Sequence, residues 1–315
     1  MFAKIIVILG PTSSGKSKLA IKIAKKYSAY GGGEIISADS RQVYKELNIG
    51  SGKITKKEMK GIPHHLIGIA SPRKIFTVSQ YQKLAKKILK NIIERGKLPI
   101  ICGGAGLYID ALIYNCQFPN VPPQPKLRKK LEKFTTEELF KQLQKLDQRR
   151  VKNIDKYNRH RLIRALEIVI STGKPVPSLK QNAILSDSTI PSDSDNIISP
   201  YDILKIGINP PKEKLQEKIE KRIKQMLRNG LLNEIKNLRK QKLSWNRIYS
   251  FGFEYKYPAF YLQNKINKKE MMDKIIKENW RYAKRQLTWF KRDQKINWII
   301  NEKVTNKLVK KFIEN

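Results

Sequence analysis

The chain has 315 residues, which is more than one small domain needs and enough to bury a large hydrophobic core. Its 65 Lys and Arg residues against 27 Asp and Glu residues give a net charge of +38, which attracts polyanions, with nucleic acid as the first candidate and an acidic membrane surface as the second. The 2 cysteines and 3 histidines form no zinc-binding pattern and no apolar run is long enough to span a membrane, so we expect a cytoplasmic monomer without a membrane segment.

The first predicted element is a buried strand over residues 5–9, which are apolar and rich in β-branched side chains. A glycine-containing turn follows it and opens a helix, so backbone N–H groups converge at a helix N-terminus, where negative charge is favoured. Lys16 adds a positive charge for phosphate oxygens, and the Ser17 hydroxyl is placed to ligate Mg²⁺. The predicted phosphate-binding residues are Gly10, Pro11, Thr12, Ser13, Ser14, Gly15, Lys16 and Ser17.

The next elements bring an acidic residue toward this loop. A second short strand over residues 34–38 ends at Asp39. Because the carboxyl ends of strands in an open parallel sheet line the ligand crevice, Asp39 should lie near the phosphate-binding loop. An Asp that only caps a following helix is the alternative interpretation. A third strand is predicted at Leu66–Ile69, and an amphipathic helix with a lysine-rich solvated face at Ser79–Arg95.

A fourth predicted strand, Leu98–Cys102, ends in the turn Gly103–Gly106 and not in an acidic residue. P-loop NTPases that hydrolyse their nucleotide normally hold Mg²⁺ with an Asp at the end of such a strand. The pattern therefore disfavours a motor or switch ATPase. A P-loop kinase of a small molecule or nucleotide that uses Asp39 as its base remains open, as does a nucleic-acid-binding P-loop protein without chemistry.

The middle of the chain changes character after a proline-rich stretch at residues 117–125. Helical patterns at Lys126–Leu146 and Asn158–Ser171, with no strand pattern between them, predict a helical insertion over residues 118–177. In the second helix, Arg161 and Arg164 lie opposite the apolar stripe and could contact consecutive backbone phosphates, although a solvated basic face is an equal alternative. Residues 178–200 are rich in Ser, Asp and Asn and predict a flexible insert.

The remaining residues, 201–315, are predicted to return to a core that begins with residues 1–117. A strand at Tyr201–Ile208 precedes helices at Lys214–Arg228 and Lys268–Asp293. The last helix carries a predicted core stripe (Met272, Ile276, Ala283, Leu287, Phe290) and a basic stripe (Arg281, Lys284, Arg285, Thr288, Arg292) with Trp280 and Trp289 beside it. The basic stripe suits nucleic acid, and we favour core positions for the tryptophans. The predicted fold class is α/β: a P-loop NTPase-like parallel sheet core with a helical insertion domain and C-terminal helices packed back on the core.

Several segments, in order and at suitable distances, resemble the tRNA dimethylallyltransferase (tRNA isopentenyltransferase) family. They are residues 10–17, Asp39–Tyr44, Gly103–Tyr108, Arg161–Glu167 and Lys284–Trp289. The resemblance covers nearly the whole chain, and its second and last segments are more specific than the phosphate loop. It implies transfer of a dimethylallyl group from dimethylallyl diphosphate to the exocyclic amine of the adenosine at position 37 of tRNA, with Mg²⁺. The small-molecule kinase becomes the alternative.

The resemblance also implies residue roles. Asp39 would accept a proton from the attacking amine, while Lys16, Thr12 and Arg222 would act on the diphosphate and Ser17 on the metal. Two positions depart from the family pattern: Ala105 stands where Thr is usual, and His160 where Gln is usual. The residues implied to hold the tRNA anticodon stem-loop and its extruded base are Asp39, Ser40, Arg41, Gln42, Ala105, His160, Arg161, Leu162, Ile163, Arg164, Arg281 and Arg285.

Overall fold

The computed structural model describes residues 3–27, 31–177, 201–299 and 302–314, and divides the chain into two compact units. The larger unit comprises Met1–Asn115 and Ala183–Asn315, and the smaller one Cys116–Asn182. The predicted insertion, residues 118–177, falls within the smaller unit. The predicted flexible insert, residues 178–200, lies outside the described residues.

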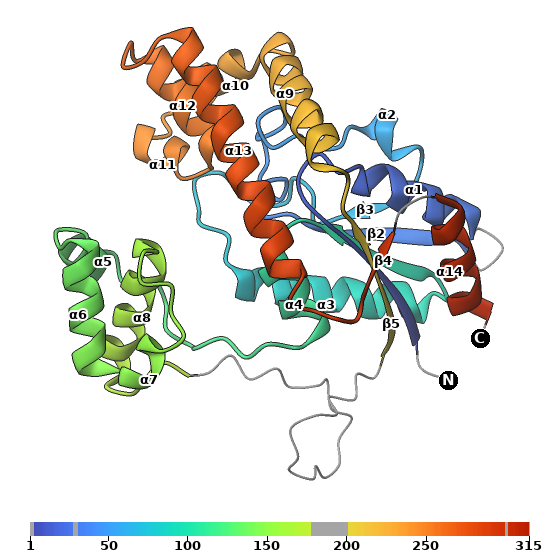
Figure 1. Cartoon of the computed structure of the whole chain (residues 1–315), viewed down its shortest axis with the longest axis horizontal. Coiled ribbons are helices and arrows are strands. Elements are labelled where there is room, and N and C mark those ends of the chain that lie inside the picture. The colour runs from blue at the N-terminus through green and yellow to red at the C-terminus, as the bar shows by residue number, and fades with distance from the viewer. Residues whose placement is uncertain (1–2, 28–30, 178–200, 300–301, 315) are drawn as a thin grey trace. The chain divides into compact units, whose positions relative to one another are not determined.

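The larger unit is built on a parallel sheet of 6 strands in the order β3-β2-β4-β1-β5-β6 (Figure 1). Leu9 and Ala38 end their strands level with Gly103, which ends its own strand, and Leu9 also pairs with Gly207, one residue before the end of its strand. The loops after these strands therefore leave at one edge of the sheet. The strands are β1 (Ala3–Leu9), β2 (Gly33–Ala38), β3 (His64–His65), β4 (Leu98–Gly103), β5 (Tyr201–Ile208) and β6 (Ile296–Ile299).

Helices cover both faces of this sheet because successive β1 side chains point to opposite faces. Ile5, Val7 and Leu9 pack with α3, α4 and the end of α13, whereas Ile6 and Ile8 pack with α1 and α14. The helices of this unit are α1 (Lys16–Lys26), α2 (Lys56–Met59), α3 (Val78–Glu94), α4 (Gly106–Ile113), α9 (Lys212–Arg228), α10 (Leu231–Lys240), α11 (Trp245–Tyr249), α12 (Phe253–Leu262), α13 (Lys268–Phe290) and α14 (Glu302–Glu314).

Two sequence predictions in the larger unit are wrong in detail. The third strand is His64–His65 and not Leu66–Ile69, because Leu66 has a φ of 62°, which no strand residue adopts. On α13 the buried stripe is shifted by one residue over the first turns: Met271 and Ile275 are buried, while Met272 and Ile276 are only half-buried. The buried positions of α13 also include two polar residues, Asn279 and Gln286.

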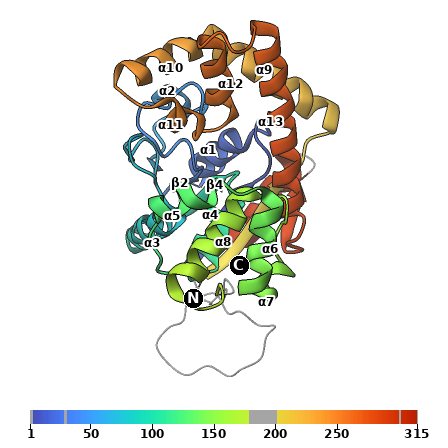
Figure 2. The same ribbon diagram turned by 90° about the vertical axis from the view of Figure 1, so that its left-hand side faces the viewer.

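The smaller unit is helical, as predicted, and has a hydrophobic cluster of its own (green in Figure 2). Its helices are α5 (Pro125–Leu131), α6 (Thr136–Leu146), α7 (Gln148–Val151) and α8 (Arg159–Thr172). The single helix predicted over Lys126–Leu146 is two helices, since Thr135 begins α6 with a capping box in which its hydroxyl and the Glu138 carboxylate satisfy each other's backbone N–H groups. None of the helices in the described part of the chain is long and apolar enough to cross a membrane.

Candidate active site

The phosphate-binding loop connects β1 to α1 in a conformation that requires its glycines. Gly10 has a φ of 145°, and a Cβ there would lie 2.5 Å from the carbonyl oxygen of Ile208. Gly15 has a φ of 96° and begins α1 without a side-chain cap or an acidic residue in the first turn. The backbone N–H groups at this helix start therefore remain available to an anion. The hydroxyls of Ser13 and Ser14 are buried with no hydrogen-bond partner among the described residues, which also fits a phosphate ligand.

A pocket of about 370 Å³ opens over this loop, entirely within the larger unit. Residues 12–18 form one wall and residues 39–42 another. The predicted residues Lys16, Ser17 and Asp39 thus lie around one cavity, together with Arg222 from α9. Sequence reasoning did not identify the remaining polar lining, which includes Ser51, His64, Glu254, Tyr282 and Gln286.

Arg222 lines the pocket beside the phosphate-binding loop. Its Nη1 donates to the Thr12 hydroxyl at 2.5 Å, and its Nη2 donates to the Ser51 carbonyl at 3.3 Å. The guanidinium lies against Gly52, where a Cβ would come within 2.3 Å of Nη2. Arg222 is therefore held beside Thr12 by contacts with the loop containing Ser51, as the sequence prediction of a shared site for Thr12 and Arg222 requires.

Gln286 of α13 ties two loops of the site together. Its Oε1 accepts from the Thr12 backbone N–H at 2.8 Å, and its Nε2 donates to the Gly104 carbonyl at 2.8 Å. Gly104 needs the absence of a side chain, because a Cβ would lie 2.3 Å from Nε2 of Gln286. The glycine turn after β4 therefore allows an approach of α13 to the phosphate loop.

Asp39 lies directly after β2 and is oriented by the turn that follows it. Its Oδ1 accepts the backbone N–H groups of Arg41 at 2.8 Å and Gln42 at 3.1 Å. Residues 40–42 form a turn and not a helix. Asp39 therefore caps a turn, and the alternative interpretation, in which it caps a helix, is wrong. Because both bonds use Oδ1, Oδ2 remains as the oxygen that can take a proton.

Lys16 is desolvated in this pocket. Its Nζ donates to the Pro11 carbonyl at 2.5 Å. Burial is the main reason that the pKa of Lys16 is lowered to about 8; Arg222 acts in the same direction, while Cys102 and Asp39 oppose the shift. An anion beside Nζ would restore the charged form, so the loop is poised to gain from binding phosphate.

The Ser17 hydroxyl suits a metal ion that is bound mainly through a phosphate ligand. The described residues contain no cluster of three or more His, Cys, Asp or Glu side chains that could hold a metal ion. Ser17 is exposed at the first turn of α1 and lines the pocket. Mg²⁺ commonly takes few protein ligands and completes its shell with substrate phosphates and water, so one hydroxyl at this position suits it.

Glu254 adds a second carboxylate that no motif indicated. It lines the pocket from the first turn of α12. Burial raises the pKa of the Glu254 carboxyl to about 6, although Arg222 and Arg41 favour its charged form. The pocket lining therefore includes two carboxylates, Asp39 and Glu254, and four cationic side chains, Lys16, Lys18, Arg41 and Arg222, in addition to the helix terminus.

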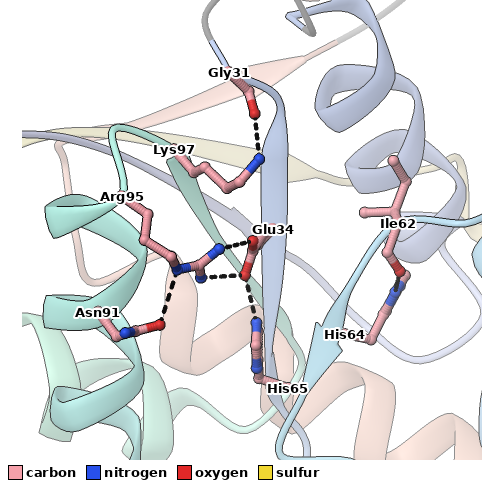
Figure 3. Close-up of polar contacts among 8 residues, drawn as sticks. All are labelled: Gly31, Glu34, Ile62, His64, His65, Asn91, Arg95 and Lys97. Atoms are coloured by element: carbon pink, nitrogen blue, oxygen red, sulfur yellow. Dashed lines mark hydrogen bonds and ion pairs between the residues drawn. The ribbon is translucent and has the colours of Figure 1, made fainter.

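A buried ion cluster fixes the start of β2, away from the phosphate loop. Figure 3 shows the Glu34 carboxylate between Arg95 and His65. Arg95 donates to both oxygens of Glu34, at 2.6 and 2.8 Å, and His65 Nε2 lies 2.8 Å from Oε2. The hydrogen bonds from Arg95 lower the pKa of Glu34 to about 2, despite burial. This cluster joins α3, β2 and β3, and so helps to hold the strand from which Asp39 projects.

Known proteins with similar sequences identify the family. A family model described as IPP transferase matches residues 42–293. The chain belongs to the IPP transferase family. It is 40% identical over 306 residues to a protein named tRNA dimethylallyltransferase from Caldanaerobacter subterraneus, covering 95% of this chain and 92% of that protein. A tRNA dimethylallyltransferase from Anoxybacillus flavithermus is 38% identical over 300 residues, covering 95% of this chain and 90% of that protein.

Solved structures of IPP transferases have the same fold. The full-length tRNA isopentenylpyrophosphate transferase from Bacillus halodurans is 33% identical and has a TM-score of 0.69, covering 99% of this chain and 95% of that chain. A eukaryotic dimethylallyltransferase described as acting on tRNA is 26% identical with a TM-score of 0.70, covering 91% of this chain and 69% of that chain. The family assignment confirms the resemblance and the predicted α/β fold, and it favours the transferase over the small-molecule kinase.

The residues of the smaller unit that were predicted to bind tRNA differ from one another in their exposure to solvent. His160 and Arg161 are exposed on α8. Leu162 and Ile163 are wrong as contacts to RNA, because their side chains are 0% and 6% exposed in the hydrophobic cluster of the unit. The helical spacing of Leu162, Leu166 and Val169 indicates an apolar core stripe on this helix, so the sequence itself carried a signal against an RNA contact at Leu162.

Arg164 takes part in a buried ion cluster. Its guanidinium donates to the fully buried Glu167 at 2.5 Å and to the Val121 carbonyl at 2.9 Å. Arg128 binds both oxygens of the same carboxylate, at 2.7 Å each. The structure therefore gives Arg164 a role in the fold of the smaller unit, and its contact with tRNA stays a prediction.

The predicted contacts on the larger unit also separate into two groups. Ser40, Arg41 and Gln42 line the pocket with Asp39, whereas Ala105, Arg281 and Arg285 are not part of its lining. Ala105 begins α4 and gives it no side-chain cap. Arg281 and Arg285 are exposed on α13, where Arg281 pairs with Glu278 at 2.6 Å.

The two tryptophans of α13 are half-buried and pack against core clusters, so the preference for core positions is met only in part. Trp289 packs on the cluster formed by α3, α4 and the sheet, and its Nε1 donates to Asp110 at 2.9 Å. Trp280 packs on the cluster between α9 and α13. Trp289 also lies where a Cβ at Gly106 would be, 2.3 Å from its ring, which explains the last glycine of the turn after β4.

Proposed function

We propose that this protein transfers a dimethylallyl group from dimethylallyl diphosphate to the exocyclic amine of the adenosine at position 37 of tRNA, and releases diphosphate. The observation that carries the proposal is one pocket in which a phosphate-binding loop, Arg222 and Asp39 face the same cavity. Transfer between an allylic diphosphate and an amine needs these two functions together: a site for the departing diphosphate and an acceptor for the proton of the amine.

The phosphate loop would bind the diphosphate. The N-terminal N–H groups of α1, the Lys16 ammonium and the Arg222 guanidinium supply positive charge where negative charge grows as the carbon–oxygen bond breaks. Because Arg222 is already fixed to Thr12 and Ser51, little reorganisation accompanies the reaction. Mg²⁺ is the proposed cofactor, with Ser17 as its protein ligand, and would neutralise part of the diphosphate charge.

Asp39 would act as the base. The nitrogen lone pair of the amine forms a bond to the first carbon of the dimethylallyl group, the carbon–oxygen bond breaks, and diphosphate leaves with the electron pair. The proton of the amine passes to Oδ2 of Asp39, the oxygen not used in the turn. Lys16 would thus stabilise the departing diphosphate, and Asp39 would accept the proton of the amine.

The acceptor base must leave its stack to reach this cavity, since the amine is inaccessible within stacked RNA. Ser40, Arg41 and Gln42 line the pocket beside Asp39 and would contact the extruded adenosine. Exposed Arg161 and His160 on the smaller unit, and Arg281 and Arg285 on α13, are proposed to hold the anticodon stem-loop. A monomer located in the cytoplasm fits this role and stays a prediction.

Total tRNA from cells with and without the protein provides the first test. Nucleosides from digested tRNA are compared by mass spectrometry, and we expect adenosine carrying the isopentenyl mass increment only where the protein is present. Restoration by the wild-type gene but not by a Lys16→Ala variant would link the product to this pocket, because a single stabilising donor contributes on the order of a hundredfold or more. The same product in cells lacking the protein would contradict the proposal.

A further inference from the structure

A second and larger depression, which we call the lysine groove, lies on the larger unit outside the pocket. Its volume is about 1230 Å³. It is formed by residues of α1, the end of β5 and the first turns of α9, the second half of α13, the end of β6, and Thr305 of α14. It meets the pocket only at Ser14, Gly15 and Lys18, which line both cavities. The lysine groove therefore begins at the outer side of the phosphate loop.

The rim of the lysine groove is strongly cationic. Its described lining residues include 6 lysines and no Asp or Glu: Lys18, Lys22, Lys212, Lys214, Lys218 and Lys284. Two pairs, Lys18 with Lys22 and Lys214 with Lys218, stand four residues apart on one helix, a spacing at which like charges destabilise the helix. The described lining of the lysine groove thus carries 6 positive side chains and no negative one.

The floor of the lysine groove is apolar and partly aromatic. Leu19, Leu215 and Leu287 contribute to it, together with Trp280 and Trp298. Both tryptophans are half-buried, so part of each ring remains accessible, and Lys284 Nζ lies 5.2 Å from the centre of the Trp280 ring. Cationic rims that follow a backbone, with aromatic rings on which bases can stack, are the arrangement by which proteins hold single-stranded nucleic acid.

We propose that the lysine groove binds a strand of RNA, with backbone phosphates on its lysines and a base against Trp280 or Trp298. The inference rests on the proposed function in taking RNA as the partner, and it adds a contact surface outside the reaction pocket. The groove is more than three times as large as the pocket at the phosphate loop, which favours a polymer over a single diphosphate. Its concave shape and recessed tryptophans favour RNA over the flat surface of an anionic membrane.

The test compares two triple variants with the same change in charge. Lys214, Lys218 and Lys284 in the groove are replaced with Gln in one variant, and Lys83, Lys87 and Lys90 on the exposed face of α3 in the other. All six are exposed, so the substitutions leave the hydrophobic contacts in place. The dissociation constant for full-length tRNA is measured against salt concentration by fluorescence anisotropy, and the Michaelis constant for dimethylallyl diphosphate is measured on the same samples.

We expect the groove variant to flatten the slope of log K against log salt by about 2, since each lost phosphate contact removes roughly 0.7 to 0.9. We expect its affinity at physiological salt to fall on the order of tenfold, with an unchanged Michaelis constant for dimethylallyl diphosphate. The α3 variant should change the slope by much less.

Equal slopes for the two variants would overturn the proposal, because the effect would then reflect total charge. A raised Michaelis constant for dimethylallyl diphosphate with an unaltered tRNA slope would also overturn it and assign the lysine groove to the small anion. Loss of binding to phosphatidylserine vesicles without loss of tRNA binding would assign it to a membrane. The tRNA salt slopes do not depend on turnover: a wild-type protein that binds tRNA through the groove but transfers no prenyl group would refute only the proposed reaction.

Discussion

Replacing Gly52 with Ala should inactivate the enzyme while leaving it folded. A Cβ at Gly52 would lie 2.3 Å from Arg222 Nη2 and 2.9 Å from Cζ, closer than atoms can approach. The end of an arginine side chain moves more easily than a backbone, so Arg222 should leave its position beside Thr12. The free energy of unfolding should fall by about 1 kcal/mol, because Gly52 has a φ of 57° and a left-handed conformation costs a side chain roughly this much.

The loss of activity should be larger than this loss of stability implies. Removing one preorganised donor to a developing negative charge costs about 3 kcal/mol of transition-state stabilisation, or a factor of 10² to 10³ in rate. Single-turnover transfer of the prenyl group to tRNA, at saturating concentrations of both substrates, measures that rate, and urea unfolding measures the stability.

Gly61→Ala is the matched control for this substitution. Gly61 has a φ of 79°, and a Cβ there would meet nothing within 4 Å. Both variants should lose a similar amount of stability, and only Gly52→Ala should lose activity. If the two variants were equally active, the position of Arg222 beside Thr12 would have no part in the reaction.

Three further substitutions or conditions test other parts of the structure. Burial lowers the pKa of Lys16 to about 8, so kcat/KM for dimethylallyl diphosphate should fall about tenfold per pH unit above pH 8 as the ammonium loses its proton; a flat profile to pH 10 would contradict this. Ala105→Thr should stabilise the protein by about 1 kcal/mol by capping α4, whereas Ala105→Val, of similar shape, should not; equal urea midpoints would exclude the cap. Glu34→Gln should destabilise the protein by about 2 kcal/mol at pH 7, because Arg95 lowers the pKa of Glu34 to about 2 and is itself partly exposed. That stability is present above pH 4.5 and is lost as the pH falls toward 2, so the difference from wild type should shrink in acid, and a constant difference would refute the role of the charge.

The parts of the site that could be predicted from sequence are those that local backbone geometry determines. The glycines of the phosphate loop, the helix that starts at Lys16 and the position of Asp39 at a strand end all follow from short patterns. They share the edge of the sheet because parallel strands in register end together. Arg222 was predicted only through the family resemblance, since its contact with Thr12 joins residues 210 positions apart.

Other site residues could not be predicted because their roles depend on tertiary contacts. Gln286 binds a backbone N–H 274 residues away, and nothing in its helical surroundings distinguishes it from an exposed glutamine. The one-residue shift in the buried stripe of α13 has the same origin, because this helix packs polar Asn279 and Gln286 inward at positions where periodicity predicts solvent. Glu254 was missed because its burial arises only when α12 packs beside Arg41 and Arg222.

The short strand β3 shows a different limit. Its two histidines are less apolar than the residues after them, and hydrophobicity placed the strand at Leu66–Ile69. The pairing of His65 with the buried Glu34 and the positive φ of Leu66 decide the register instead. A polar partner supplied by another strand can thus outweigh a hydrophobic pattern.

The most direct measurement of the proposed reaction is the single-turnover rate of isopentenyladenosine formation in tRNA by wild-type protein and by Asp39→Asn, with mass spectrometry locating the product at position 37. The Asn side chain keeps the acceptor oxygen that the N–H groups of Arg41 and Gln42 need but cannot take a proton at neutral pH. We predict that the rate falls by roughly a hundred- to ten-thousandfold while the affinity for tRNA changes little. An Asp39→Asn protein that modifies the same adenosine at the wild-type rate would contradict the account.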